Sequence, residues 1–135
     1  MNNEELKKRV NTAIKSQLYR RGYVAPVDVL LDIGMLTKED YQAWRTGRVD
    51  YLERVCHGNL NKLSLVMHEI RAYGIQHQLK QSVTFYGVQC GKKTPGGSGK
   101  KQLRFSKSDD PKIERWYATH FVDTIRVKEL KENKK

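Results

Sequence analysis

Apolar residues recur at helical spacing through the first 80 positions, which predicts a mainly helical N-terminal region. In the first such segment the apolar residues occupy one face and charged residues occupy the opposite face, as in an amphipathic helix that covers a core. The apolar face consists of Leu6, Val10, Ala13, Ile14 and Leu18. We therefore expect a helix over residues 3–21 that ends at Gly22, because glycine tolerates the left-handed conformation found just past helix ends.

Shorter helical segments follow, and most carry a recognisable start or end. Pro26 suits the first position of a helix, and Gly34 closes the segment that it opens. Thr37 and Asn59 are good N-caps, since their side-chain oxygens can accept a hydrogen bond from a free backbone N–H. After these caps and the glycines between them, we expect helices over residues 38–46, 50–57 and 60–78.

The period changes after residue 80. Val83, Phe85 and Val88 stand among β-branched and polar residues in an extended run, and residues 102–106 offer a second run of this kind. Between them lies GKKTPGGSGK (91–100), which is rich in glycine and lysine. This order predicts a β-hairpin with a long loop at its tip.

Asp110 followed by Pro111 is typical of a helix start, so a last helix is expected from this point. Its inner face would hold Ile113, Trp116, Tyr117 and His120 or Phe121. The charged segment 127–135 has too few apolar residues to join a core and is expected to be disordered. The sequence thus predicts one α+β domain over residues 1–126: a helical N-terminal bundle, a β-hairpin and a C-terminal helix.

Positive charge is unevenly distributed along the chain. Lys and Arg number 26 against 15 acidic residues, for a net charge of +11. Residues 81–108 contain six basic residues and no acidic one, and residues 1–21 contain six basic against two acidic. Residues 22–58 are slightly acidic. A segregated excess of this kind gives a positive patch that attracts polyanions.

Nucleic-acid binding without catalysis is the function that this charge pattern favours, with DNA and RNA both open. Each phosphate that a Lys or Arg neutralises releases a condensed counterion, which gives affinity that falls with salt. Tyr86 is expected on the polar face of the hairpin, where its ring could stack on a base. The predicted phosphate contacts come from the first helix, from the loop and from the strand after it, and they are Lys7, Lys8, Lys15, Arg20, Lys92, Lys93, Lys100, Lys101, Arg104 and Lys107. This hypothesis requires the first helix and the loop to share one surface.

Two other kinds of site fail on spacing. In a phosphate-binding P-loop the first glycine would stand at Thr94, and a hydroxyl residue would follow Lys100, where this chain has Lys101. The two cysteines, Cys56 and Cys90, and the four histidines form neither a CxxC nor an HxxxH pattern, which makes structural zinc improbable. We expect no cofactor, no metal and no catalytic residues.

Two alternatives to nucleic-acid binding stay open. The slightly acidic region 28–53 contains Tyr41, Trp44 and Tyr51 and could meet a protein partner, as in a regulatory module. More weakly, Asp109, Asp110 and Glu114 could hold a divalent ion in a metal-dependent nuclease. The absence of a signal sequence, and of any run of about 18 apolar residues, favours a cytoplasmic protein that does not enter a membrane.

Two long segments also resemble a family of small bacterial proteins of unknown function. They are YRRGYVAPVDVLLDIGMLTKEDYQAWRTGRVDYLERVC (19–56) and LRFSKSDDPKIERWYATHFV (103–122). The resemblance covers more than half of the chain and implies a bacterial, cytoplasmic origin. It carries over no activity and no functional residue.

Overall fold

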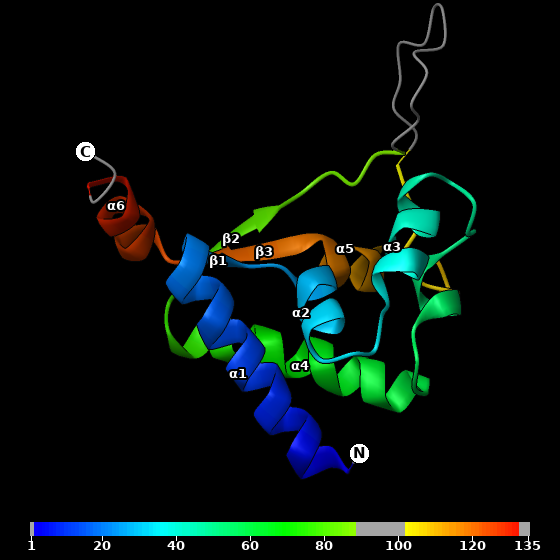
Figure 1. Ribbon diagram of the computed structural model, residues 1–135, viewed down its shortest axis with the longest axis horizontal. Coiled ribbons are helices and arrows are strands. Elements are labelled where there is room, and N and C mark those ends of the chain that lie inside the picture. Colours follow the sequence, from blue (N-terminus) through cyan, green and yellow to red (C-terminus); the bar gives the residue numbers. More distant parts are fainter. Residues whose placement is uncertain (1, 89–101, 133–135) are drawn as a thin grey trace, which may run out of the picture.

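A computed structural model describes residues 2–88 and 102–132 of the chain (Figure 1). In these residues the order of elements is α1 (Asn3–Arg21), β1 (Tyr23–Val24), α2 (Pro26–Asp32), α3 (Lys38–Arg45), the 3₁₀ turn η1 (Leu52–Val55), α4 (Leu60–Gln76), β2 (Lys80–Val83), α5 (Pro111–Ala118), β3 (Thr119–Val122) and α6 (Thr124–Glu132). The predicted α+β class is confirmed, with a helical N-terminal region and a helix at the C-terminal end.

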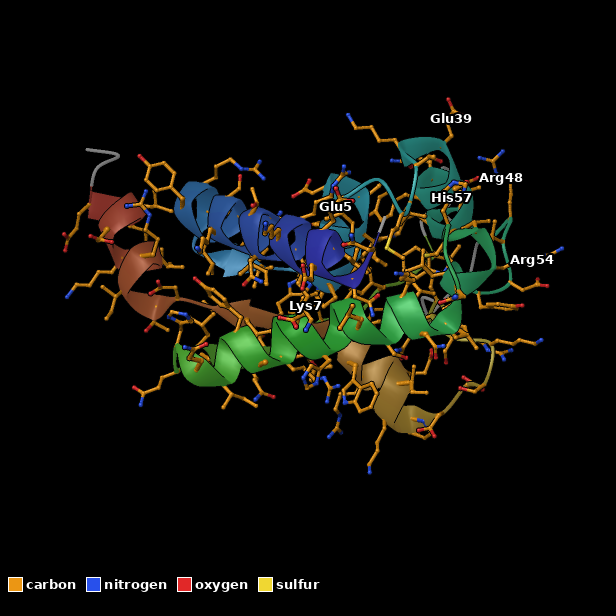
Figure 2. The ribbon with its side chains drawn as sticks, turned by 90° about the horizontal axis from the view of Figure 1, so that it is seen from below. Glu5, Lys7, Glu39, Arg48, Arg54 and His57 are labelled. Carbon is orange, nitrogen blue, oxygen red and sulfur yellow. The ribbon has the colours of Figure 1, made fainter. Side chains whose placement is uncertain are left out.

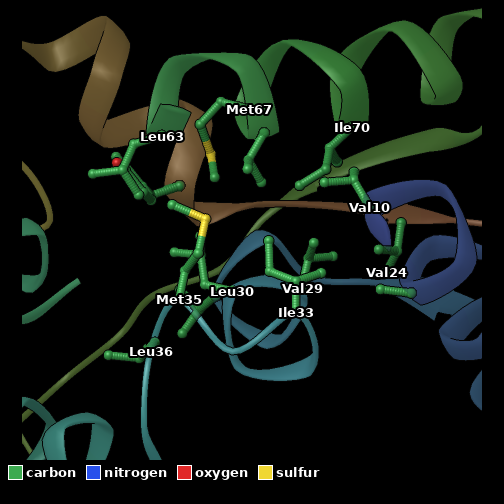
Figure 3. Close-up of a cluster of buried hydrophobic side chains, with 14 of the residues drawn as sticks. Val10, Val24, Val29, Leu30, Ile33, Met35, Leu36, Leu63, Met67 and Ile70 are labelled. Atoms are coloured by element: carbon green, nitrogen blue, oxygen red, sulfur yellow. The ribbon is translucent and has the colours of Figure 1, made fainter. Parts of the chain in front are cut away.

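Part of the core lies between α4 and the segment made of α2 and the turn that follows it. Leu63, Met67 and Ile70 on one side of α4 point toward Leu30 of α2 and Met35 in the turn that follows it (Figure 3). All five are almost fully buried. Because each large apolar side chain contributes about 1.5–3 kcal/mol when it leaves water, this cluster is a principal stabilising contact of the fold.

A small antiparallel sheet lies over α1 and α4, with strand order β1-β3-β2 (Figure 1). In the central strand β3, Val122 lies opposite both Tyr23 of β1 and Lys80 of β2. The sequence prediction that residues 119–122 continue the last helix is wrong, because α5 ends at Ala118. Buried and half-buried residues alternate along β3, which is the two-residue period of a strand. Its residues Thr-His-Phe-Val also favour an extended backbone.

The two segments predicted to pair in the hairpin do approach each other in antiparallel fashion. They meet at one bridge, between Gly87 and Gln102, next to which the Leu103 N–H donates to the Tyr86 carbonyl at 2.8 Å. The longer ladder of this region belongs to β2 and β3 instead. The predicted tip of the hairpin, residues 91–100, lies outside the described residues.

The predicted helix caps are present. The side chains of Thr37 and Asn59 accept from the third backbone N–H of α3 and α4, at 3.1 and 2.9 Å, and Gly22 ends α1 with a φ of +81°. The expected helix over residues 50–57 is reduced to η1. Where a disordered tail was expected from Val127, α6 extends to Glu132, and the Arg126 guanidinium donates twice to the Tyr19 carbonyl of α1.

The close contact at Gly74 predicts how a substitution there changes stability. A Cβ at this position of α4 would overlap the ring of Phe121, which packs directly on the helix backbone. Gly74→Ala should therefore lower the free energy of unfolding by about 1–3 kcal/mol, the usual cost of overpacking. Helix propensity alone would instead make the alanine variant about 1 kcal/mol more stable. Chemical denaturation therefore distinguishes the two effects by whether the free energy of unfolding falls or rises.

Phe121→Leu provides the control for this prediction. It should recover part of the loss in the Gly74→Ala background, because the smaller side chain makes room for the methyl group. A stabilised Gly74→Ala variant would contradict the close packing of β3 on α4.

Candidate functional site

A polar groove of about 470 Å³ runs along α1 beside α2. Three cations, Lys8, Arg9 and Arg20, line it together with the hydroxyls of Thr12 and Ser16, and the carboxylate of Asp32 lies on the α2 side. The Arg20 Nε donates to the Ser16 Oγ at 3.3 Å. We call this feature the α1–α2 groove.

The three cations of the α1–α2 groove have no acidic partner in the part of the chain that the structure describes. Among the described residues that line the groove, Asp32 is the one carboxylate, and its Oδ2 accepts a hydrogen bond from the Gln17 Nε2 at 3.0 Å. The groove therefore presents a net positive charge on a rigid helix.

The buried amide of Gln17 fixes the relative position of α1 and α2. Gln17 is 1% exposed, although it is polar and lies one turn before the end of α1. Its Oε1 accepts from the Ala25 N–H at 3.0 Å and from the Arg21 guanidinium at 2.7 Å, while its Nε2 donates to Asp32. Arg21 in turn pairs with Asp28 at 2.6 Å. We call these five residues the Gln17 cluster.

The predicted cations of α1 do not all belong to the groove. Lys7 points toward α4, where its Nζ lies 3.9 Å from the Glu69 carboxylate (Figure 2). Lys15 is exposed but does not line the groove. Arg9 was missed by the sequence analysis, although its spacing of eleven residues from Arg20 places both on one stripe of a helix.

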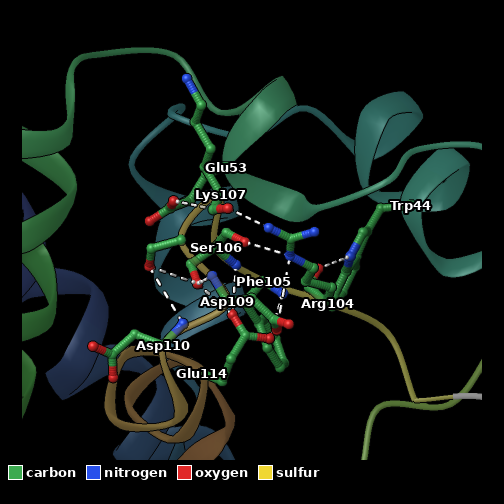
Figure 4. Close-up of polar contacts among 10 residues, drawn as sticks. Trp44, Glu53, Arg104, Phe105, Ser106, Lys107, Asp109, Asp110 and Glu114 are labelled. Carbon is green, nitrogen blue, oxygen red and sulfur yellow. Dashed lines mark hydrogen bonds and ion pairs between the residues drawn. The ribbon is translucent and has the colours of Figure 1, made fainter.

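Arg104 and Lys107 lie in a different setting, in the segment 104–110 (Figure 4). Two carboxylates organise this segment. Glu114 of α5 accepts from the Phe105 N–H, the Ser106 N–H and the Ser106 hydroxyl, at 2.6–2.9 Å. Glu53 of η1 accepts from the Lys107 N–H at 3.0 Å. The segment is therefore held in one conformation by charge-assisted hydrogen bonds, which are the strong ones.

The polar contacts of the Arg104 side chain lie within this segment. Its guanidinium donates to the Ser106 and Lys107 carbonyls and lies 3.8 Å from the Asp109 carboxylate. It also lies over the Tyr51 ring, 5.4 Å from the ring centroid. These contacts leave Arg104 a structural role in the described residues.

The three acidic residues considered for a nuclease also have structural partners. Asp110 caps α5 by accepting from the Lys112 N–H, Asp109 pairs with Arg104, and Glu114 organises the segment described above. Within residues 2–88 and 102–132, no group of three His, Cys, Asp or Glu side chains is arranged to hold a metal ion. Burial raises the pKa of the Cys56 thiol to about 12, so it is a poor nucleophile at neutral pH.

Tyr86 is part of the core, which corrects the expectation of an exposed stacking ring. It is 6% exposed and packs against Trp44 and Phe105. Its hydroxyl lies 2.9 Å from the His120 Nε2, and burial raises its pKa. The ring is consequently not available to a base.

The described phosphate-contact residues do not share one surface. The α1–α2 groove lies on the far side of α2 from α3, whereas Arg104 and Lys107 lie beside η1 and α5 at the other end of the molecule (Figures 1 and 2). Lys92, Lys93, Lys100 and Lys101 lie outside the described residues.

Neither a family model, nor a curated protein, nor a solved structure matches the chain. In the described residues, no helix is both long enough and apolar enough to cross a membrane.

Gln17 generates a prediction about the groove. Gln17→Leu should lower the free energy of unfolding by about 1–3 kcal/mol, because the buried Ala25 N–H loses its acceptor. Gln42→Leu, on the exposed side of α3, is the matched control and should change stability by less than about 0.5 kcal/mol. Equal stability of the two variants in urea denaturation would contradict the role given to Gln17.

His120 generates a pH prediction. Burial lowers the pKa of His120, and the nearby Arg21 adds to this, while Asp28 opposes it. Below the ordinary histidine pKa of about 6.5, the unfolded chain therefore takes up a proton that the folded chain resists, so stability falls as the pH falls through this value.

The comparison that isolates this effect is between the wild type and His120→Gln. The wild type should lose more stability than the variant between about pH 7.5 and pH 5.5, on either side of that pKa. An equal loss in thermal or urea unfolding would show that His120 is not buried in its neutral form.

Proposed function

We propose that the protein binds nucleic acid, without catalysis, and that the α1–α2 groove is its main contact with phosphates. The lysines of residues 91–101 provide a second contact. DNA and RNA share the phosphate chemistry on which the proposal depends.

The observation that carries the proposal is the set of uncompensated cations in the groove. Lys8, Arg9 and Arg20 line one groove without an ion pair in the described residues. Cations that lie close together repel one another, and phosphate oxygens relieve that repulsion. Arginine is well suited to this role, because its planar fork can donate two parallel hydrogen bonds to a phosphate.

The hydroxyl groups in the groove support a phosphate ligand further. Thr12 and Ser16 lie between the cations, and Ser and Thr side chains are frequent donors to phosphate oxygens in complexes with nucleic acids. A ligand that combines charge with several acceptor oxygens suits this lining better than a simple halide ion.

The distribution of charge over the chain supports a long ligand. A second basic segment without acidic residues, residues 81–108, lies far from α1 in sequence, and its described cations lie away from the groove. A polyanion can engage two separate basic regions at once, and each then raises the effective concentration of ligand at the other.

The proposal is tested with a variant that removes two groove cations, Arg9→Gln with Arg20→Gln. Affinity for duplex and single-stranded oligonucleotides should fall, and the slope of log K against log salt should decrease by about two, because each phosphate contact contributes about one. Fluorescence anisotropy over a salt series measures both quantities.

The matched control is Arg48→Gln with Arg54→Gln, which removes the same charge from exposed positions near α3 and η1 (Figure 2). It should change the slope much less. Replacing Lys92, Lys93, Lys100 and Lys101 by glutamine tests the second contact and should also reduce the slope. Equal effects of the two double variants would contradict the groove as the main contact, and no binding at low salt would refute the function.

A further inference from the structure

A second groove lies between α4 and α5, across α4 from α1 (Figure 2). Its volume is also about 470 Å³, but its floor is apolar. Met67 and Tyr117 form the buried floor, while Leu60, Ile113 and Trp116 form more exposed walls. Leu60 is 59% exposed. We call this feature the α4–α5 groove.

Lys107 lies at the mouth of the α4–α5 groove, and its backbone is fixed. Its N–H donates to the Glu53 Oε1, and the segment around it is held by Glu114. In the described part of the chain the Lys107 ammonium forms no ion pair. The fold therefore positions a lysine whose ammonium has no ion-pair partner among the residues that the structure describes.

The carboxylate of Glu53, which also lines this groove, already accepts hydrogen bonds from the fold. Glu53 accepts from the Lys107 N–H with one oxygen and from the Tyr117 hydroxyl, at 2.7 Å, with the other. Both Glu53 oxygens therefore already accept a hydrogen bond from the fold, and they make the lining polar at one end.

A second cation, Arg71, lies against Trp116, although it does not itself line the groove. The Arg71 guanidinium lies over the Trp116 ring, 3.9 Å from the ring centroid. Its Nε is buried and has no hydrogen-bond partner among the residues that the structure describes. Desolvation lowers the pKa of Arg71, as expected for a cation that burial removes from water without an adjacent carboxylate.

We propose that the α4–α5 groove binds a small organic anion with an apolar body, namely an aromatic or aliphatic carboxylate. The apolar body covers Leu60, Ile113 and Trp116, and the carboxylate accepts hydrogen bonds from the Lys107 ammonium. This function is separate from nucleic-acid binding, because the two grooves lie on different sides of α4.

The size and lining of the groove favour such a ligand over larger or more polar ones. Sites for small molecules commonly have volumes of about 300–1,000 Å³ and a mainly apolar lining with a few polar groups. A carboxylate with an apolar body matches this lining, because its body can cover the apolar residues while its charge faces Lys107.

The probe for the test is 2-naphthoate, and the reporter is the indole N–H of Trp116 in an NMR titration. The chain has two tryptophans, and Trp44 is buried elsewhere with its Nε1 bonded to the Arg104 carbonyl, so its signal serves as the reference. Trp116→Phe assigns the two signals. We expect saturable shifts of the Trp116 signal, and weaker binding of neutral 2-naphthamide by about tenfold or more, the value of a charge-assisted hydrogen bond.

Two pairs of variants separate this site from general attraction to a basic protein. Lys107→Met should weaken binding of 2-naphthoate by about tenfold, since it removes the ammonium and keeps the backbone N–H that Glu53 holds. Lys112→Met makes the same change at an exposed position of α5 outside the groove and should leave binding unchanged. Leu60→Ser should weaken binding more than Ile75→Ser, which alters an exposed apolar residue of the same helix.

The proposal is overturned by equal effects of Lys107→Met and Lys112→Met, by the absence of a saturable Trp116 shift, or by tighter binding of adenosine monophosphate than of 2-naphthoate at this signal. None of these results bears on the oligonucleotide slopes of the Arg9 and Arg20 variant. Failure of one proposal is thus distinguishable from failure of the other.

Discussion

The buried amide of Gln17 is the interaction on which the arrangement of α1 depends. It joins the C-terminal part of α1 to the backbone at Ala25 and to Asp32 at the end of α2, and its Oε1 accepts from the Arg21 guanidinium, which also pairs with Asp28. A buried amide with unpaired groups would be costly, so the two helices can pack in few other ways. This fixed packing places Lys8, Arg9 and Arg20 along one groove and engages the nearest carboxylate with an internal donor.

At the other end of the molecule, carboxylates fix the backbone in a similar way. Glu53 and Glu114 come from different elements, and together they accept hydrogen bonds from three successive backbone N–H groups, those of Phe105, Ser106 and Lys107. The carboxylates thus serve the fold, and Lys107 beside them forms no ion pair in the described residues, whereas Arg104 pairs with Asp109. At both proposed anion sites, a carboxylate accepts hydrogen bonds from the fold while a cation near it forms no ion pair in the described residues.

Local signals in the sequence were sufficient for the helical half of the fold and insufficient for the sheet. The stripe of α1 and the caps Thr37 and Asn59 depend on neighbours within four residues, so pattern and propensity reveal them. β3 directly follows α5 and pairs with β2 and with β1, about 100 residues earlier; these are tertiary contacts that override a helical pattern. Likewise Tyr86 stands in a polar run yet is buried, because Trp44 and Phe105 surround it. Arg9 could have been found from helical phase, whereas the α4–α5 groove depends on contacts between distant segments.

The central claim is that the α1–α2 groove is the surface that meets nucleic acid, and amide chemical-shift mapping tests it most directly. On titration with a short oligonucleotide at low salt, the account predicts that the largest shifts in the described part of the chain fall on residues 8–20 of α1 and on Asp32. Shifts centred on α4 and α5, or spread evenly over all exposed basic residues, would contradict it.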